Sequence, residues 1–419
     1  MQSTHWRTRL YPWFVWLLAS SFLFYKYLLQ VSPSVMVNEL MQSFHLTGQS
    51  MGNLAAFYFY AYLLMQLPVG ILLDNFNPKR LIVGAILVCA LGAYCFSQAE
   101  HLAVAKLGRV FIGLGGAFSA VGTMKLISLW FPANRFALVS GLMMSVGMLG
   151  AVCAGAPLSY MVSHYGWRGS LFDAAILGIV LAICIALFIQ DKRVTVPRAD
   201  KQSLRNLLDD LKAIINKPQS WIIALYSGLA FAPVSAFAGL WGIPFLMTKY
   251  GLDRSHVAAM VSLVFIGFAI GSPLSGWISD KIARRKPIMA LGTLVSLLSL
   301  SAVIYLPGVT PLALSILLFI FGFFTGFFFV SFANIREIHS PHLSGTSIGF
   351  INLFNAACGA LSEPLIGKLL DMHWAHKTIA GARVFSSANY HHALLALPVA
   401  LILALILLCF VKESHCKQG

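Results

Sequence analysis

Three ionisable residues stand inside long apolar stretches of this sequence: Lys26, Arg109 and Glu363. A charged side chain within the hydrocarbon layer of a membrane is costly, so such residues often serve solute binding or transport. At a helical rise of about 1.5 Å per residue, Lys26 lies roughly 21 Å from one face of the layer and Arg109 roughly 9 Å from the other. These depths coincide in a layer about 30 Å thick, so the two residues are predicted to lie at one level. The alternatives are that Lys26 extends toward the interface or that Arg109 bonds only helix carbonyls.

Glu363 is the residue that we predict to carry a coupling proton. Because a carboxyl group taken out of water is stabilised in its neutral form, a buried glutamate is suited to binding and releasing a proton. Pro364 follows it directly and predicts a break in the helix at this point. The alternative is structural, with the carboxylate paired to Lys368 or capping the broken helix.

Neutral donors complete the predicted substrate-binding set, which is Lys26, Arg109, Tyr25, Tyr58, Trp241, Asn352 and Asn355. The two asparagines are three residues apart and therefore share one helix face. Tyrosines at positions 58, 60 and 62 cannot all point to one side, so at most two of them reach a cavity. The phenylalanine-rich run 319–329 is predicted mainly to pack and to face lipid. It should also make the C-terminal side of any cavity the more apolar one.

A second motif occurs twice, with its glycines and aspartates repeated at an offset of 206 residues (276 − 70 and 280 − 74). Each copy begins with a glycine that would let two helices approach closely, continues to an aspartate four residues later, and ends in basic residues. The first aspartate, Asp74, can pair with Arg135. Both aspartates stand at the ends of apolar runs, which favours a gate over a binding site. The predicted gating residues are Gly70, Asp74, Lys79, Arg80, Arg135, Gly276, Asp280, Arg284 and Arg285.

The elements that must position these residues are membrane-spanning helices. The chain of 419 residues is 58% hydrophobic and only 10% charged, whereas soluble domains carry about 25% charged residues. Period-two alternation is absent, so helices must satisfy the backbone. Twelve apolar runs have roughly the 20 residues that a crossing requires. They centre near residues 21, 62, 90, 115, 149, 180, 232, 266, 297, 322, 357 and 401.

A polar segment divides the runs into two sets of six, which predicts three parts: residues 1–190, 191–218 and 219–419. Leucines and isoleucines between 204 and 215 recur at helical spacing, which predicts an amphipathic helix at the cytoplasmic interface. With both termini in the cytoplasm, the loops on that side hold 19 of the basic residues and the loops outside hold 7. This asymmetry is the positive-inside rule.

The same asymmetry explains the net charge of +15 without a nucleic-acid partner. Six of the seven cysteines fall inside the apolar runs and form no CxxC pair, so they are interpreted as packing residues. His373 and His376 are interpreted as solvated loop residues, and we predict neither a metal site nor a cofactor. The few acids within the runs are too sparse for a catalytic centre, and no phosphate-binding loop is present, so we expect no enzymatic activity.

The glycine–aspartate–basic motif after the second run resembles the signature of the major facilitator superfamily, although Asn77 stands where that family usually has a second glycine. Arg109, followed by Gly113, Gly115 and Gly116, is similar to its intramembrane arginine element. The glycines of the fifth run, with Ala156-Pro157 in place of Gly-Pro, resemble an element of exporters. The resemblance covers nearly the whole chain. It implies an all-α membrane protein with twelve transmembrane helices in two pseudo-symmetric six-helix bundles, whose first and fourth spans line a central cavity. The resemblance thus implies that Lys26 and Arg109, in those spans, form one cationic patch that faces the substrate.

From the resemblance and the cationic patch we expect a secondary active transporter in a bacterial inner membrane that acts as a monomer. It would move a small, carboxylate-bearing solute, such as an organic acid, amino acid, peptide or siderophore, by alternating access and in symport with protons. An amphiphile or drug exporter of the same superfamily is the alternative nearest to this reading. A membrane sensor that does not transport is the other.

Overall fold

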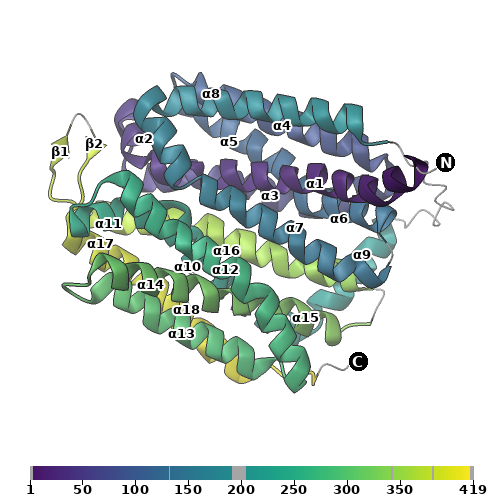
Figure 1. Cartoon of the computed structure of the whole chain (residues 1–419). Coiled ribbons are helices and arrows are strands. Elements are labelled where there is room, and N and C mark those ends of the chain that lie inside the picture. Colours follow the sequence, from purple (N-terminus) through teal and green to yellow (C-terminus); the bar gives the residue numbers. More distant parts are fainter. Residues whose placement is uncertain (1–2, 132, 191–203, 341–342, 380–381, 416–419) are drawn as a thin grey trace.

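The computed structural model describes residues 3–131, 133–190, 204–340, 343–379 and 382–415. Its N-terminal half, drawn in purple and blue in Figure 1, consists of helices that run nearly parallel or antiparallel to one another. These are α1 (Ser3–Val31), the short η1 (Ser32–Val35), α2 (Val37–Phe44), α3 (Gly48–Asn75), α4 (Pro78–Ser97), α5 (Leu102–Gly116), α6 (Phe118–Trp130), α7 (Ala133–Cys153) and α8 (Ala156–Phe188).

After α9 (Leu204–Ile215), the C-terminal half repeats this arrangement. Its elements are α10 (Pro218–Pro233), the π-helical η2 (Val234–Trp241), α11 (Gly242–Tyr250), α12 (Arg254–Ile282), α13 (Lys286–Tyr305), α14 (Pro311–Thr325), η3 (Gly326–Phe329), α15 (Val330–Glu337), α16 (Ser344–Met372), α17 (Ser387–Leu394) and α18 (Ala396–Phe410). Two short antiparallel strands, β1 (Thr378–Ile379) and β2 (Ala382–Arg383), form a hairpin between α16 and α17.

Twelve crossings account for these helices. Nine described segments are long and apolar enough to cross a membrane, and one of them, Val139–Phe188, covers most of α7 and all of α8 and therefore counts twice. The remaining two are α3, with 28 residues, and α16, with 29. The predicted fold class, an all-α protein with twelve spans in two six-helix bundles, is confirmed.

Local sequence signals set the helix starts. Asn77 accepts hydrogen bonds from the backbone N–H groups of Lys79 and Arg80, and Pro78 occupies the first turn of α4. A side-chain acceptor before a proline in the first turn is the usual start of a helix. The asparagine that replaces a family glycine thus acts as a helix cap.

Pro364 does not break its helix, so the predicted break beside Glu363 is wrong. Helix α16 is continuous from Ser344 to Met372 with this proline inside it. Proline is tolerated within membrane helices because neighbouring helices can satisfy the freed backbone groups. Glu363 therefore lies on an unbroken helix and caps no helix end.

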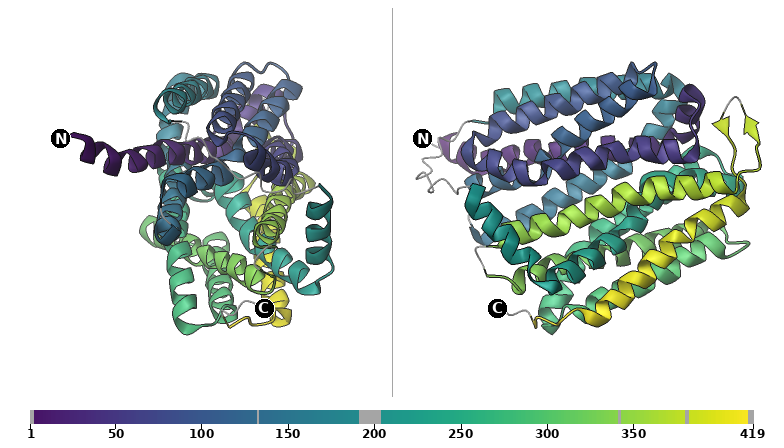
Figure 2. Two further views of the ribbon diagram at one scale, coloured as in Figure 1. Left: turned by 90° about the vertical axis from the view of Figure 1, so that its right-hand side faces the viewer. Right: turned by 180° about the vertical axis from the view of Figure 1, so that it is seen from behind.

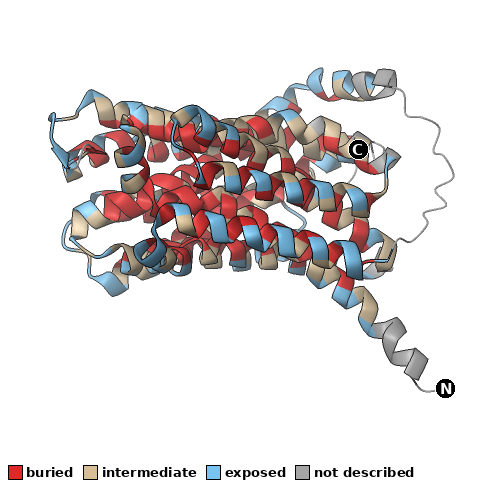
Figure 3. Cartoon of the chain, turned by 90° about the horizontal axis from the view of Figure 1, so that it is seen from above, coloured by how far each residue is buried: buried red, intermediate tan, exposed pale blue. Residues whose placement is uncertain are grey.

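Both α1 and α18 reach the same end of the molecule, which we call the termini end, and the β1–β2 hairpin marks the opposite hairpin end (Figures 1 and 2). Helix α9 also lies at the termini end. Figure 3 shows that buried residues concentrate where the helices meet and that the outer faces are exposed. Large apolar side chains such as Leu187 and Leu312 are exposed on those outer faces, as expected for a surface that contacts lipid.

Candidate functional site

A cavity of about 110 Å³ lies between the two halves. The N-terminal half contributes side chains from α1, α3 and α7, and the C-terminal half contributes α10, η2, α12, η3, α15 and α16. Five of the sequence-predicted site residues line it: Lys26, Tyr58, Asn352, Asn355 and Glu363.

Lys26 provides the positive charge of the cavity wall. Its Nζ lies 3.6 Å from the centroid of the Tyr27 ring, 5.3 Å from that of Tyr62 and 5.8 Å from that of Tyr58. Aromatic faces attract a cation but accept none of its N–H bonds in full. Within the described residues no hydrogen bond or ion pair reaches this ammonium group, although the residue is only 5% exposed. The wall therefore presents a desolvated cation that lacks an anionic partner.

Tyr58 stands beside this lysine with an unused hydroxyl. The residue is fully buried, and its hydroxyl oxygen has no hydrogen-bond partner among the described residues. The absence of a side chain at Gly116 makes room for both residues, because a Cβ there would lie 3.2 Å from Lys26 Cγ and 3.4 Å from the Tyr58 hydroxyl. Because this hydroxyl is enclosed by protein, Tyr58 lines the cavity with its ring.

The expectation that at most two of the three tyrosines at positions 58, 60 and 62 reach a cavity is confirmed. Tyr58 and Tyr62, four residues apart, line the cavity. Tyr60 points elsewhere and donates its hydroxyl to Asn53 at 3.3 Å. This is the placement that helical periodicity requires.

Glu363 faces the cavity from the C-terminal half and is 3% exposed. Its Oε1 accepts a long hydrogen bond of 3.4 Å from Ser235, and its Oε2 is enclosed with no described partner. No described ion pair joins Glu363 to Lys368. Instead, Trp241 donates its indole N–H to the backbone carbonyl of Glu363 at 3.0 Å, which anchors α16 to η2 at this point.

Asn352 and Asn355 line the cavity from the same helix as Glu363, about two to three turns before it. The Asn355 Oδ1 accepts a hydrogen bond of 2.8 Å from Ser227. This contact leaves the amide N–H₂ group as the part of Asn355 that can donate to a ligand.

Arg109 does not line the cavity, and its predicted contact with substrate is not supported by this geometry. Its Nη1 donates to the Leu29 carbonyl at 2.9 Å, and its Nη2 donates to the carbonyls of Gln30 and Ala55 at 3.3 and 3.0 Å. Helix α1 ends at Val31, so its last carbonyls lack partners within the helix, and a cation is favoured at that end. The structure thus realises the alternative in which Arg109 bonds helix carbonyls.

Tyr25 and Trp241 also lie outside the described cavity wall. The Tyr25 hydroxyl packs against α8, where a Cβ at Gly178 would be 2.3 Å from it. Trp241 is fully buried and holds the backbone of α16 as described above. Both side chains support the walls rather than the surface of the cavity.

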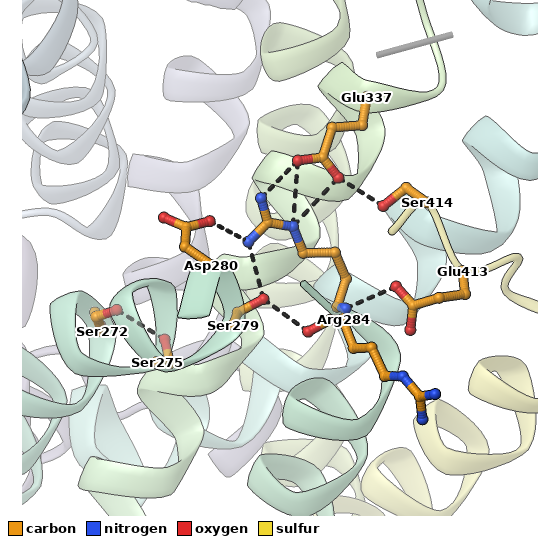
Figure 4. A network of polar contacts seen from close by, with 9 residues as sticks. Ser272, Ser275, Ser279, Asp280, Arg284, Glu337, Glu413 and Ser414 are labelled. Carbon is orange, nitrogen blue, oxygen red and sulfur yellow. Dashed lines mark hydrogen bonds and ion pairs between the residues drawn. The ribbon is translucent and has the colours of Figure 1, made fainter. Parts of the chain in front are cut away.

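The second copy of the repeated motif forms a charge network within the C-terminal half (Figure 4). Arg285 donates from Nη1 to Asp280 and from Nη2 to Glu337, each at 2.6 Å, and its Nε lies 3.2 Å from both Glu337 oxygens. The backbone N–H groups of Arg285 and Lys286 donate to Glu413 at 2.7 and 2.9 Å. This network ties α12, α13, α15 and the segment after α18 together at the termini end.

The two motif glycines do not bring helices together here, so that interpretation is wrong for this conformation. A Cβ at either Gly70 or Gly276 would meet no described atom within 4 Å. The side chain of Asp74 lies outside the described residues, so its predicted pair with Arg135 has no structural account. Arg80, Arg135 and Arg284 are exposed and Lys79 is half-buried.

A family model described as the Major Facilitator Superfamily matches residues 15–363 and 228–415. The chain belongs to the Major Facilitator Superfamily. This superfamily consists of transport proteins rather than enzymes, and the chain is an integral membrane protein with several spans.

Two curated relatives align with nearly the whole of this superfamily chain. GudP of Bacillus subtilis strain 168, named a probable galactarate/D-glucarate transporter, is 24% identical over 401 residues, which is 87% of this chain and 86% of GudP. UhpC of Escherichia coli K12, named a membrane sensor protein, is 22% identical over 396 residues, or 89% and 88% of the two chains.

A solved superfamily structure supports the fold. The crystal structure of a bacterial homologue of the human lysosomal transporter Spinster, in an inward-facing and occupied conformation, has a TM-score of 0.78 to this chain. The two are 17% identical, and the match covers 96% of this chain and 97% of that one.

Sequence reasoning missed several residues of the transporter's cavity and network. Gln30 lines the cavity four residues after Lys26, a spacing that would have indicated it. Phe328 and Phe329 line it too, although the run that contains them was expected mainly to pack. Ser235 and Gly239 lie in π-helical turns, which carry no clear signal in the sequence. Glu337 and Glu413 were not identified because nothing in the sequence links them to the repeated motif.

The charge network of the C-terminal half makes a stability prediction. Arg285→Gln should destabilise the protein by about 3–5 kcal/mol, because it leaves the nearly buried carboxylate of Glu337 without its cation. We expect a lower melting temperature in detergent. Arg284→Gln changes the exposed neighbour and should leave the melting temperature within error. Equal effects of the two variants would show that the network adds no stability.

Proposed function

We propose that this superfamily member is a secondary active transporter that moves a small, carboxylate-bearing solute by alternating access, with protons as the coupling ion. The observation that carries the proposal is Lys26, a cation without an anionic partner among the described residues of the cavity wall. A carboxylate would supply the missing charge and accept the free N–H groups. The relative named for galactarate and D-glucarate, two dicarboxylates, supports an acid as substrate.

The proposal includes the orientation expected from the basic residues. The termini end, α9 and the charge network around Arg285 would face the cytoplasm of a bacterial inner membrane, and the hairpin end would face outward. The protein would act as a monomer, because each chain holds a complete cavity between its own halves.

Contacts between the two halves support alternating access, since they cluster toward the hairpin end in the described part of the chain. Asp371 in α16 accepts hydrogen bonds of 2.8 Å from the backbone N–H groups of Gly48 and Gln49, at the start of α3. Arg254 in α12 pairs with Glu39 and donates to the Val35 carbonyl at 3.0 Å. A carboxylate at a helix N-terminus is stabilised by the helix dipole. These contacts hold the outer end closed.

The gate at the opposite end would be formed by the repeated motif. No described atom would lie within 4 Å of a Cβ at Gly70 or Gly276 in the present conformation. In the alternate conformation, closure of the termini end would bring these surfaces and the nearby charges of Lys79, Arg80, Asp280 and Arg284 against the other half.

Gly367→Val tests closure of the outer end. A Cβ at Gly367 would lie 2.1 Å from the Gly48 carbonyl oxygen, so α3 and α16 cannot remain in contact. We expect transport to stop and an engineered cysteine at Ser235, in the cavity wall, to react with an impermeant maleimide from the hairpin side. Gly276→Val, where no described atom lies within 4 Å, should not open that path. Normal transport by Gly367→Val would contradict the proposed closed state.

Transport itself is tested with purified protein in liposomes. The expected result is uptake of a labelled carboxylate that an imposed pH difference enhances and that the unlabelled acid competes for. The relative UhpC, named a membrane sensor, favours one second candidate, a sensor on the same fold. Binding of the acid without any exchange across the membrane would support the sensor and reject the transporter.

A further inference from the structure

We infer that the solute of this cavity is an amphiphilic monocarboxylate: one carboxylate on an apolar, aromatic or branched body. The inference rests on the proposed function, in that it takes Lys26 as the carboxylate site, and it adds the chemistry of the rest of the solute. Its basis is the juxtaposition of one available cation with a continuous wall of phenylalanine rings.

A single carboxylate is favoured because the cavity offers one place for it. Among the described lining residues Lys26 is the only cation, and the guanidinium of Arg109 is already taken by three backbone carbonyls. The opposite side of the cavity holds Glu363. In its ionised form this residue repels a second carboxylate, and in its neutral form it supplies no compensating charge.

An ammonium group on the solute is not favoured, although Glu363 is an acid. An ionised carboxylate normally accepts several hydrogen bonds, and Glu363 accepts one long bond, from Ser235. Its unpartnered Oε2 is enclosed by protein and offers no surface to a ligand. A solute amine would therefore lose its water without gaining a strong partner.

The C-terminal wall selects the apolar body. Six phenylalanines line it: Phe231, Phe265, Phe268, Phe328, Phe329 and Phe332. The rings of five of them, all but Phe265, form one chain of contacts, with centroid separations of 5.7 Å for Phe231 and Phe328, 5.6 Å for Phe268 and Phe329, and 5.2 Å for the stacked Phe329 and Phe332. Apolar surface placed here gains about 25 cal/mol per Å².

The same wall disfavours a polyhydroxylated body. Each hydroxyl buried without a partner costs roughly 1–3 kcal/mol by protein mutational measures. On the C-terminal side the described polar lining is limited to Ser235, Asn352, Asn355 and Glu363, and three of these already bond protein atoms. The chain should thus differ in substrate from its relative named for galactarate and D-glucarate.

Binding of four matched probes to the purified full chain tests this. The probes are 3-phenylpropanoate, its primary amide, L-phenylalanine, which adds an ammonium group, and D-glucarate, a polyhydroxylated dicarboxylate. We expect 3-phenylpropanoate to bind at least about tenfold more tightly than each of the others, a difference of about 1.4 kcal/mol. Phe332→Gln should weaken its binding by a similar factor. Phe324→Gln, a half-buried phenylalanine outside the described cavity wall, should not.

The outcomes distinguish a failure of the amphiphile inference from a failure of the proposed function. If D-glucarate binds as well as or better than 3-phenylpropanoate, carboxylate recognition stands and the amphiphile inference is overturned. Tighter binding of L-phenylalanine also overturns it, in favour of a zwitterion. If the amide binds as well as the acid, recognition at Lys26 fails and the proposed function fails with it. No binding of 3-phenylpropanoate overturns the inference. Unchanged binding of this probe by folded Phe332→Gln would show that the phenylalanine wall does not select the solute, which also overturns the inference.

Discussion

Lys26→Gln is expected to reduce the affinity for a carboxylate substrate roughly 30-fold or more. Removal of one partner of a buried, hydrogen-bonded charge pair costs about 2–5 kcal/mol, since the ligand's carboxylate would enter the cavity without a cation. Glutamine keeps much of the length and polarity of the side chain, so the shape of the wall changes little. The measurement is a titration of purified wild type and variant with a bound carboxylate, 3-phenylpropanoate first, and with the matching amide, whose affinity should change little.

The same substitution should not destabilise the protein. Lys26 is buried without an anionic partner among the described residues, so its charge opposes folding and its removal relieves a desolvation penalty. The melting temperature of the ligand-free variant should equal or exceed that of wild type. Lys106→Gln is the control, because Lys106 contacts the Phe57 ring outside the described cavity wall. Unchanged carboxylate affinity in Lys26→Gln would show that Lys26 does not bind the carboxylate of the substrate.

The sequence was sufficient for the fold class because length and hydropathy decide it. Apolar runs of about 20 residues can cross a membrane only as helices, and the repeated motif marks the two halves. Helix α16 is not among the segments that length and hydropathy identify as spans. This helix contributes the polar residues Asn352, Asn355 and Glu363 to the cavity, which lowers its hydropathy.

The depth of a residue could be predicted, whereas its direction could not. Lys26 and Arg109 were placed at one level by counting residues, but counting gives no helix rotation. Arg109 turns to the carbonyls at the end of α1, whose position depends on where that helix stops before η1. A cationic side chain next to unsatisfied carbonyls is the stable arrangement. The sequence Val31-Ser-Pro33 holds a weak signal of this helix end.

Contacts between residues that are far apart in the chain could not be predicted from the sequence. Asp371 and Gly48 are 323 residues apart, and only the packing of α3 against α16 brings them together. The same holds for Arg285 and Glu337, which no local pattern connects. Helical periodicity did succeed within one element, where it predicted that at most two of Tyr58, Tyr60 and Tyr62 reach the cavity, and two of them do.

Glu363→Gln is expected to abolish the accumulation of substrate that an imposed pH difference drives, while exchange of labelled for unlabelled substrate persists. Glutamine resembles the protonated acid in shape and cannot release a proton. The binding wall around Lys26 lies in the other half and is unchanged. The measurement is uptake into liposomes with and without a pH difference, together with exchange at equal pH. Glu100→Gln, an exposed carboxylate, is the control and should accumulate substrate as wild type does.

The separation of the two activities decides between a coupling role and a structural role for Glu363. Ser235 can donate its hydroxyl to an amide oxygen as well as to a carboxyl oxygen, and Trp241 binds only the backbone carbonyl at this position, so both contacts survive the substitution. If the role of Glu363 were only structural, the Gln variant would lose accumulation and exchange together, and its melting temperature would be lower. Accumulation that still responds to the pH difference in folded Glu363→Gln would place the proton on another group or on the substrate itself.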